Sequence, residues 1–127
     1  MNVRVKQRRA NFDFYKQELS EFDGITFLEE PKGHFSNRWL TTILVDSKKT
    51  GGVSREDLRL ALEAENIESR PLWKPMHMQP VFKDFPYYGD GLSEKLFEIG
   101  LCLPSGSNLT DEDRERVVGV IKKTLGK

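Results

Sequence analysis

Apolar residues recur near the start of the chain at a spacing typical of a helix. Four large apolar side chains follow one another at steps of three, four and three residues: Phe12, Tyr15, Leu19 and Phe22. This spacing places them on one helical face, and Gly24 ends the pattern, so we expect an entry helix over residues 1–23. Arginine and lysine crowd its beginning, where the helix dipole favours carboxylates, as in a helix that starts further upstream.

Two apolar runs follow the helix, and both have the composition of β-strands. Residues 25–28 are rich in β-favouring side chains, and residues 39–45 are almost continuously apolar, as in a strand that is covered on both faces. Ser54 and Asp57 then resemble a capping box that opens a second helix. After that helix, a third strand is expected to start at Ile67.

The stretch over residues 71–86 holds four of the six prolines and cannot form an α-helix, because each proline fixes φ and removes a hydrogen-bond donor. We expect an ordered, irregular loop that carries large side chains. Beyond it, residues 92–99 predict a short helix and residues 101–104 a short strand. Thr110 and Asp113 form a second capping-box pattern, which opens the last helix.

These elements predict an α+β fold, a small and mostly antiparallel sheet with helices packed on one face. The chain has 127 residues, with 37% hydrophobic and 31% charged side chains, and we expect one domain over residues 1–127. A domain of this size can build one core without disulfides or metal. The fold class alone selects no function, because such folds host many.

Charge and apolar content exclude several classes of partner. Twenty lysines and arginines balance twenty aspartates and glutamates, so the net charge is zero and no overall field favours nucleic acid or an acidic membrane surface. No stretch approaches the ~20 apolar residues of a membrane span, and no apolar signal segment follows the basic start. We therefore expect a soluble, cytoplasmic protein without nucleic-acid or membrane partners.

Metal and thiol chemistry find little support in the sequence. The two histidines, His34 and His77, lie far apart with a single cysteine to help them, so no transition-metal site is expected. Cys102 lies within an apolar run, where we expect a small core residue rather than a nucleophile. Small residues at positions 104–107 could leave backbone amides free for an anion, although a plain strand-to-helix turn explains them better.

The proline-rich loop carries the most informative set of side chains. Arg70 can form a bidentate pair with a phosphate or carboxylate, Trp73 can stack on a ring, and His77 can donate or accept a hydrogen bond near neutral pH. Together they favour a polar, planar, anionic ligand. Packing is the alternative, in which Trp73 and the methionines fill a core or an interface and Arg70 pairs with a local carboxylate.

The chain resembles the DegT/DnrJ/EryC1/StrS sugar aminotransferases, in their C-terminal domain only. The resemblance covers essentially the whole chain through blocks at residues 8–15, 36–40, 70–79, 97–106 and 109–110. Two blocks are specific, Arg-Pro-Leu-Trp-Lys-Pro followed by His77 and Gln79, and Phe-Glu-Ile-Gly-Leu-Cys-Leu-Pro-Ser-Gly. These blocks are most similar to members that act on UDP-linked 4-keto-sugars in bacterial glycan synthesis, the bacillosamine-type aminotransferases.

The resemblance implies the small domain of a fold-type I aminotransferase, which covers the active-site cleft of a dimer and contacts a nucleotide-linked keto-sugar. It places His77 toward the substrate and Arg70 near the same cleft. It adds Trp73, Asn37 and Arg38 as substrate-binding residues whose role can equally be packing. It implies no catalytic and no cofactor-binding residue in this chain, and glutamate as amino donor is an expectation of the same kind.

The cofactor of such enzymes, pyridoxal phosphate, forms a Schiff base with a lysine of their large N-terminal domain. No lysine here stands in that motif, so the resemblance implies the last third of an enzyme, inactive alone and without the cofactor-binding domain. The alternative is a non-catalytic module that binds a nucleotide sugar or a protein partner through the same loop. Without the large domain and dimer mate that this region faces in the family, the aromatic loop would expose an apolar patch that favours self-association.

Overall fold

The computed structural model describes residues 2–126, and its first element is helix α1 (Asn2–Leu19). The helix buries the predicted apolar face, including Tyr15, which is fully buried. It ends before Phe22, whose side chain is still buried as the chain turns toward the sheet. The expected start of the entry helix at Met1 lies outside the described residues.

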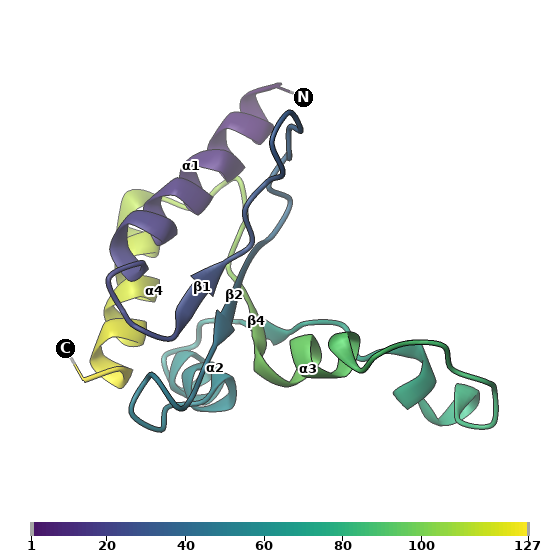
Figure 1. Ribbon diagram of the computed structural model, residues 1–127. Coiled ribbons are helices and arrows are strands. Elements are labelled where there is room, and N and C mark those ends of the chain that lie inside the picture. Colours follow the sequence, from purple (N-terminus) through teal and green to yellow (C-terminus); the bar gives the residue numbers. More distant parts are fainter. Residues whose placement is uncertain (1, 127) are drawn as a thin grey trace.

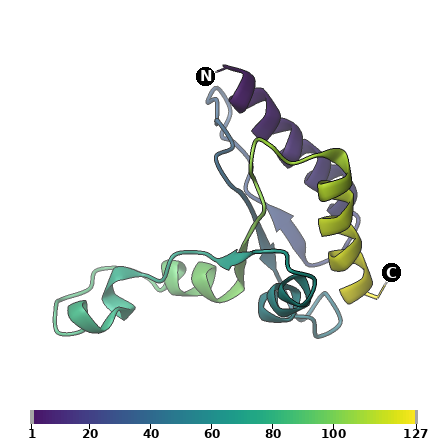
Figure 2. The same cartoon turned by 180° about the vertical axis from the view of Figure 1, so that it is seen from behind.

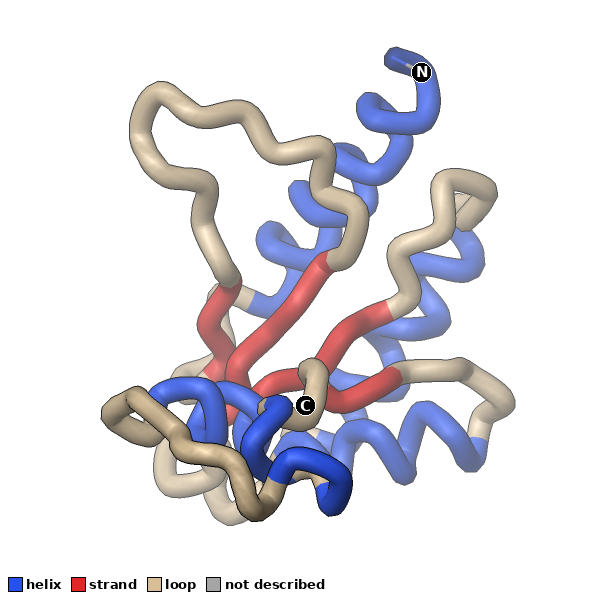
Figure 3. Tube along the Cα trace, turned by 90° about the vertical axis from the view of Figure 1, so that its right-hand side faces the viewer, coloured by secondary structure: helices blue, strands red, loops and turns tan. Residues whose placement is uncertain are grey.

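Within residues 2–126, four short strands form one antiparallel sheet, drawn in red in Figure 3. They are β1 (Ile25–Phe27), β2 (Thr41–Val45), β3 (Arg70–Pro71) and β4 (Gly100–Leu103), in the order β1-β2-β4-β3. All three pairings are antiparallel, with β2 and β4 at the centre of the sheet. The predicted α+β class with a small antiparallel sheet is therefore confirmed.

Three helices cover one face of this sheet (Figures 1 and 2). Helices α2 (Arg55–Ala64) and α4 (Asp111–Thr124) join α1 there, and α4 contacts both of the others. Helix α3 (Leu92–Ile99) buries no side chain and lies apart from this layer, against β2 and β3. The buried apolar residues of the core are Tyr15, Leu19, Phe22, Ile25, Ile43, Val45, Leu58, Leu62, Ile67, Leu101, Leu103, Val117, Val118 and Ile121.

Both predicted capping boxes are formed. The Ser54 hydroxyl accepts a hydrogen bond from the Asp57 amide, and the Asp57 carboxylate accepts one from the Ser54 amide; Thr110 and Asp113 repeat this arrangement at α4. Hydrogen bonds from the cap residues lower the pKa of both aspartates, because these bonds favour the ionised form. Both helices therefore start where the local sequence signals predict.

Strand β2 is shorter than the apolar run that predicts it. Ile43 is buried toward the helices, whereas Thr42 and Leu44 on the other face are only half-buried. The sequence predicted a strand covered on both faces, and the structure covers only one of them fully. The strand begins only after Trp39, because Arg38 adopts φ +47°, in the left-handed region, and turns the chain just before it.

The expectation of a third strand that starts at Ile67 is wrong in its position. The Ile67 amide donates to the Leu62 carbonyl at 2.9 Å in the turn that ends α2, so this residue is not free to pair in the sheet. Strand β3 starts only at Arg70, opposite Cys102 of β4. It is only two residues long, although the Leu72 amide beyond it still donates to the Gly100 carbonyl at 3.3 Å.

Residues 74–91, which we call the arm, project away from the core (Figures 1 and 2). The arm contains two short 3₁₀ helices, Met76–Met78 and Pro80–Phe82, and no α-helix, as its prolines predict. None of its side chains is buried. The arm therefore takes no part in the core that the other helices and the sheet enclose.

Candidate functional site

A groove of about 560 Å³ lies at the β3 edge of the sheet, between the segment before β2 and the base of the arm. Its wall is mostly apolar and includes aromatic side chains from three separate segments: Trp39, Trp73 and Phe97. Its polar lining residues are Glu68, Ser69, Arg70 and Ser105. A concave, largely apolar hollow with a few polar groups is the usual form of a small-molecule site.

Two exposed tryptophan rings line this groove. Trp39 and Trp73 are 57% and 65% exposed, and their ring centroids lie 6.0 Å apart with 37° between the planes. The Asn37 side-chain oxygen accepts a hydrogen bond from the Trp39 amide at 3.0 Å, so Asn37 orders the backbone that presents the Trp39 ring. Exposed aromatic faces of this kind can stack on a planar ring.

Arg70 supplies the positive charge at the groove. Its Nε donates to the Glu68 carboxylate at 2.7 Å, while 78% of its side chain stays exposed. An ion pair this exposed contributes little, about 0–1 kcal/mol. A phosphate or carboxylate of a ligand can therefore replace Glu68 on the guanidinium.

The structure separates His77 from this groove. His77 lies in the arm, where its Nε2 is 2.6 Å from Glu94 Oε1 and its ring stacks on Tyr87 with 3.6 Å between centroids. A second hollow, of about 440 Å³, surrounds it and is lined by other aromatic side chains of the arm. Arg70 and Trp73 therefore share one site, and His77 occupies another.

Arg38 is committed to the fold around the β1–β2 loop. The residue is 8% exposed, its guanidinium lies 3.6 Å from the centroid of the Phe12 ring, and its Nη1 donates to the Leu28 carbonyl at 2.7 Å. These contacts favour the packing alternative for Arg38. A direct contact between Arg38 and a substrate stays a prediction.

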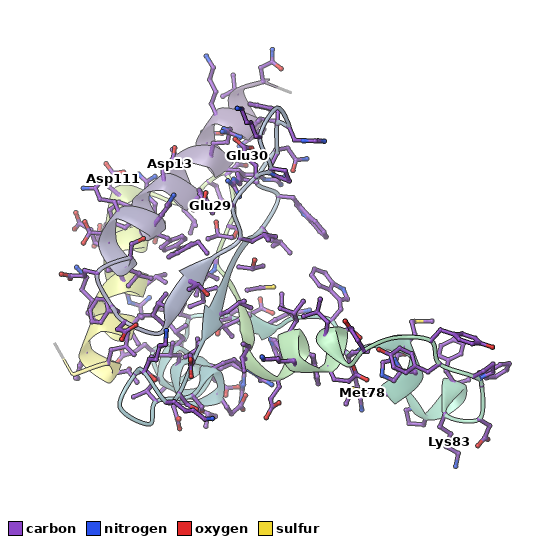
Figure 4. All side chains as sticks on the ribbon, viewed as in Figure 1. Asp13, Glu29, Glu30, Met78, Lys83 and Asp111 are labelled. Atoms are coloured by element: carbon purple, nitrogen blue, oxygen red, sulfur yellow. The ribbon has the colours of Figure 1, made fainter. Side chains whose placement is uncertain are left out.

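The β1–β2 loop is tied to α1 by Glu30, which Figure 4 shows beside that helix. The Glu30 carboxylate accepts hydrogen bonds from the Arg9 guanidinium at 2.9 and 3.0 Å and from the Ser36 amide at 2.7 Å. The Arg9 bonds, followed by the Ser36 bond, lower the pKa of Glu30 to about 2. Since the loop leads into Asn37 and Trp39, Glu30 anchors the segment that forms one wall of the groove.

Acid is expected to loosen this loop in a defined pH window. The pKa of Glu30 is about 2 in the folded chain against an ordinary value of 4.5, so its stabilising contribution is present above 4.5 and is lost as the pH falls toward 2. The protection of the Ser36 amide, measured by NMR as its exchange rate relative to the intrinsic rate at each pH, should fall in this window, with the β2 and β4 amides as control. Glu30→Gln should exchange fast throughout, and a Ser36 amide that already loosens above pH 4.5 would contradict the assignment.

Trp39, Glu68 and Phe97 line the groove although none of them was predicted as a site residue from the sequence. Trp39 belongs to an apolar run that predicts a strand, yet Asn37 two residues earlier is a turn signal. Phe97 lies off the apolar stripe of its helix, and an aromatic residue outside such a stripe signals a second contact. Glu68 lies two residues before Arg70, the spacing that places strand residues on one face.

Metal and thiol sites find no support in the described part of the chain. Residues 2–126 contain no group of three or more histidine, cysteine, aspartate or glutamate side chains that could hold a metal ion. Cys102 is a small buried residue, as predicted, 8% exposed, and it lines the groove; burial raises the pKa of its thiol. Within the same residues, no helix combines the length and the apolar character that crossing a membrane requires.

Pyridoxal phosphate, the cofactor that the sequence resemblance implies, needs a lysine for its Schiff base and a cradle for its phosphate. No lysine within residues 2–126 lines the groove at β3, and the one cation among its lining residues, Arg70, is exposed beside Glu68. The residues present therefore do not fit the cofactor by themselves. They offer groups that can bind a ligand, without a group that reacts.

Comparisons with known proteins agree with the sequence resemblance. The model of the DegT/DnrJ/EryC1/StrS aminotransferase family matches residues 1–122. A protein of Bacillus subtilis (strain 168), assigned by name as a pyridoxal phosphate-dependent aminotransferase, EpsN, is 43% identical over 125 residues, which cover 95% of this chain and 31% of that protein. GDP-perosamine synthase of Vibrio cholerae is 31% identical over 124 residues, which cover 93% of this chain and 32% of that protein.

Solved structures agree in fold. The aminotransferase TlmJ from Streptoalloteichus hindustanus matches with a TM-score of 0.81 and 26% identity, over 95% of this chain and 31% of its own length. The present chain therefore spans about a third of the length of the proteins it matches. Because the family model matches nearly all of its residues, the chain belongs to the DegT/DnrJ/EryC1/StrS aminotransferase family.

Proposed function

We propose that this chain is the substrate-covering domain of a pyridoxal phosphate-dependent aminotransferase that transfers an amino group to a nucleotide-linked keto-sugar. Support comes from the family match and from the names of two relatives, a pyridoxal phosphate-dependent aminotransferase and GDP-perosamine synthase. The proposed partners are the nucleotide sugar, a cofactor-binding large domain outside residues 1–127, and a dimer mate.

The groove at β3 carries this proposal. It presents ring-stacking surface and an arginine, and no lysine among its described lining residues. A nucleotide sugar has matching groups, a planar base for Trp39 and Trp73 and a diphosphate for Arg70. Binding groups without a reacting group are what a domain needs when it closes over a substrate whose chemistry takes place on another domain.

The proposed substrate-binding residues differ in how they act. Arg70 and Trp73 bind at the groove, and His77 binds from the arm. Asn37 and Arg38 contribute by ordering the β1–β2 loop that presents the groove wall. None of the five is proposed as a catalytic residue, because the Schiff-base lysine would belong to the large domain.

The arm supports the proposed contact with a large domain or a dimer mate. Its exposed large apolar side chains are Met76, Met78, Val81, Phe85, Tyr87 and Tyr88. Figure 4 shows Met78 and Lys83 on this projecting segment, well away from the core. Exposed apolar side chains in this number favour association, whether with another domain or with a second copy of the chain.

Arg70→Ala in the complete enzyme is expected to raise KM for the nucleotide sugar roughly ten- to hundredfold, the effect of a lost charge-assisted contact. The value of kcat should change less, because the contact is made equally in ground and transition states. The half-reaction of the amino donor, in which no nucleotide sugar is present, should be unaffected. Arg116→Ala, at an exposed arginine on α4 that does not line the groove, is the matched control and should change neither value.

Two outcomes would count against the proposal. If Arg70→Ala impaired the donor half-reaction, the residue would serve the cofactor chemistry rather than substrate binding.

The chain alone, supplied with pyridoxal phosphate and glutamate, is expected to show no turnover. Calorimetric binding of a UDP-sugar by the chain alone, with no change when the large domain is supplied, would favour the alternative of a non-catalytic binding module.

A further inference from the structure

Glu94, in the first turn of α3, holds two rings of the arm at once. Its Oε1 lies 2.6 Å from His77 Nε2, and its Oε2 accepts a hydrogen bond from the Tyr87 hydroxyl at 3.4 Å. The two rings stack on each other, with 3.6 Å between centroids and 19° between planes. One carboxylate therefore determines where both rings of this stack lie.

The rest of the arm offers His77 little support. No side chain of the arm is buried, and its backbone hydrogen bonds join near neighbours, as from the Met78 amide to the Pro75 carbonyl at 3.0 Å. In contrast, the side chains of His77 and Glu94 are only 20% and 32% exposed. This pair is therefore a half-buried polar link between the arm and α3.

Glu94 is itself held in place. The Ser93 hydroxyl donates to its Oε2 at 3.2 Å, and Arg55 caps the other end of α3 by donating from Nε to the Glu98 carbonyl at 3.1 Å. Hydrogen bonding to its own backbone amide, with smaller contributions from His77 and Ser93, lowers the pKa of Glu94. At neutral pH the side chain is therefore a carboxylate, which can only accept hydrogen bonds.

A partner that only accepts hydrogen bonds decides which nitrogen of His77 carries the hydrogen. Nε2 must donate to Glu94, and Nδ1 has no hydrogen-bond partner within residues 2–126. We propose that Glu94 is a positioning residue, which fixes the orientation and tautomer of the His77 ring so that Nδ1 is offered to the substrate. The pairing rests on the geometry, whereas the identity of the ligand rests on the proposed function.

The charge of the pair indicates which part of the substrate it meets. With Glu94 ionised, the pair carries one negative charge when His77 is neutral and none when His77 is protonated. No lysine or arginine of residues 2–126 forms an ion pair with Glu94, and the other groups on it are the Tyr87 and Ser93 hydroxyls. A site without net positive charge suits a neutral hydroxyl group better than a phosphate. Nδ1 of His77 therefore meets a hydroxyl group of the sugar.

The pairing can be tested in this chain, which has only two histidines. With nitrogen-15 histidine, NMR at neutral to mildly alkaline pH should show the Nε2–H tautomer for His77, whereas His34, whose Nδ1 lies 3.3 Å from the Lys32 carbonyl oxygen, should favour the opposite tautomer. Glu94→Gln removes the partner that only accepts, so both ring-nitrogen signals of His77 should move toward those of a short unstructured histidine peptide. Glu98→Gln, at an exposed glutamate of the same helix, is the matched control and should move neither.

Kinetics of the complete enzyme test whether the pairing serves the sugar. Glu94→Gln and His77→Ala should each raise KM for the nucleotide sugar about two- to tenfold, the effect of one lost neutral hydrogen bond. The double variant should add nothing further, because both changes remove the same contact. Glu94→Asp keeps the carboxylate and should restore part of the NMR signature.

Two results would overturn the inference at different points. Unchanged His77 signals in Glu94→Gln would show that Glu94 does not position the ring, whatever the enzyme acts on. A signature that is lost in Glu94→Gln while KM stays unchanged in both single variants would overturn the contact between His77 and the sugar. In that second case Glu94 would still position the His77 ring, but the proposal that His77 binds the substrate would be wrong.

Discussion

Replacing Leu62 by alanine is expected to lower the free energy of unfolding by about 2–5 kcal/mol. Leu62 lies in α2, is 0% exposed and belongs to the core between the helices and the sheet. The substitution removes apolar contacts and leaves a cavity that a close-packed core can fill only in part. Because a domain is stable by roughly 5–15 kcal/mol, this loss is a large share of the whole.

Helix α2 provides a matched control for this measurement. Leu60 lies two residues earlier in the same helix and is 49% exposed, so Leu60→Ala should change the free energy of unfolding by less than about 0.5 kcal/mol. Urea unfolding followed by circular dichroism gives both values. Equal losses for the two variants would contradict the orientation of α2 against the sheet.

Gly24→Ala is expected to lower the free energy of unfolding by roughly 2–5 kcal/mol, from backbone strain and crowding together. Gly24 adopts φ +92°, which side chains rarely tolerate. A Cβ at this position would lie 2.8 Å from Thr50 Cγ2 and 2.9 Å from the Asp46 carbonyl oxygen. The Asp46 amide also donates to the Gly24 carbonyl at 2.9 Å, so the two segments cannot separate without losing that hydrogen bond.

Gly51→Ala separates the cost of backbone strain from the cost of crowding. It has φ +72°, and a Cβ there would meet nothing within 4 Å, so Gly51→Ala should show the backbone cost alone, about 1 kcal/mol. Denaturant midpoints compared at an unchanged slope give the two free energies. If Gly24→Ala lowered the free energy of unfolding no more than Gly51→Ala does, the inference that neighbouring atoms crowd a Cβ at Gly24 would be wrong.

The helix starts were predictable because their signals are local. Ser54 with Asp57, and Thr110 with Asp113, complete their hydrogen bonds within three residues, so the sequence contains the whole interaction. Strand positions lack this property. Ile67 has a β-favouring side chain, but the turn that ends α2 takes its amide, and pairing in β3 depends on the distant β4.

The candidate site was predictable in its residue types and not in their grouping. Arg70, Trp73 and His77 stand close together in one loop, which suggested a single ligand site. In the structure the base of that loop joins the sheet edge while its tip forms the arm, so Arg70 and Trp73 line the groove and His77 lies in a separate hollow. A short stretch of chain that leaves the sheet is enough to carry neighbouring residues to different surfaces.

By itself the sequence determined the α+β class, the family and the starts of the capped helices, because these follow from residue identity and from contacts between near neighbours. Only the tertiary structure decided that Trp39 lies 6.0 Å from Trp73, that Arg38 is buried over Phe12, and that a carboxylate of α3 bonds the arm. All three contacts join segments that are separated along the chain. Their approach is set by the β2–β4–β3 pairing and by packing of the core, which depend on the whole chain at once and leave no local pattern in it.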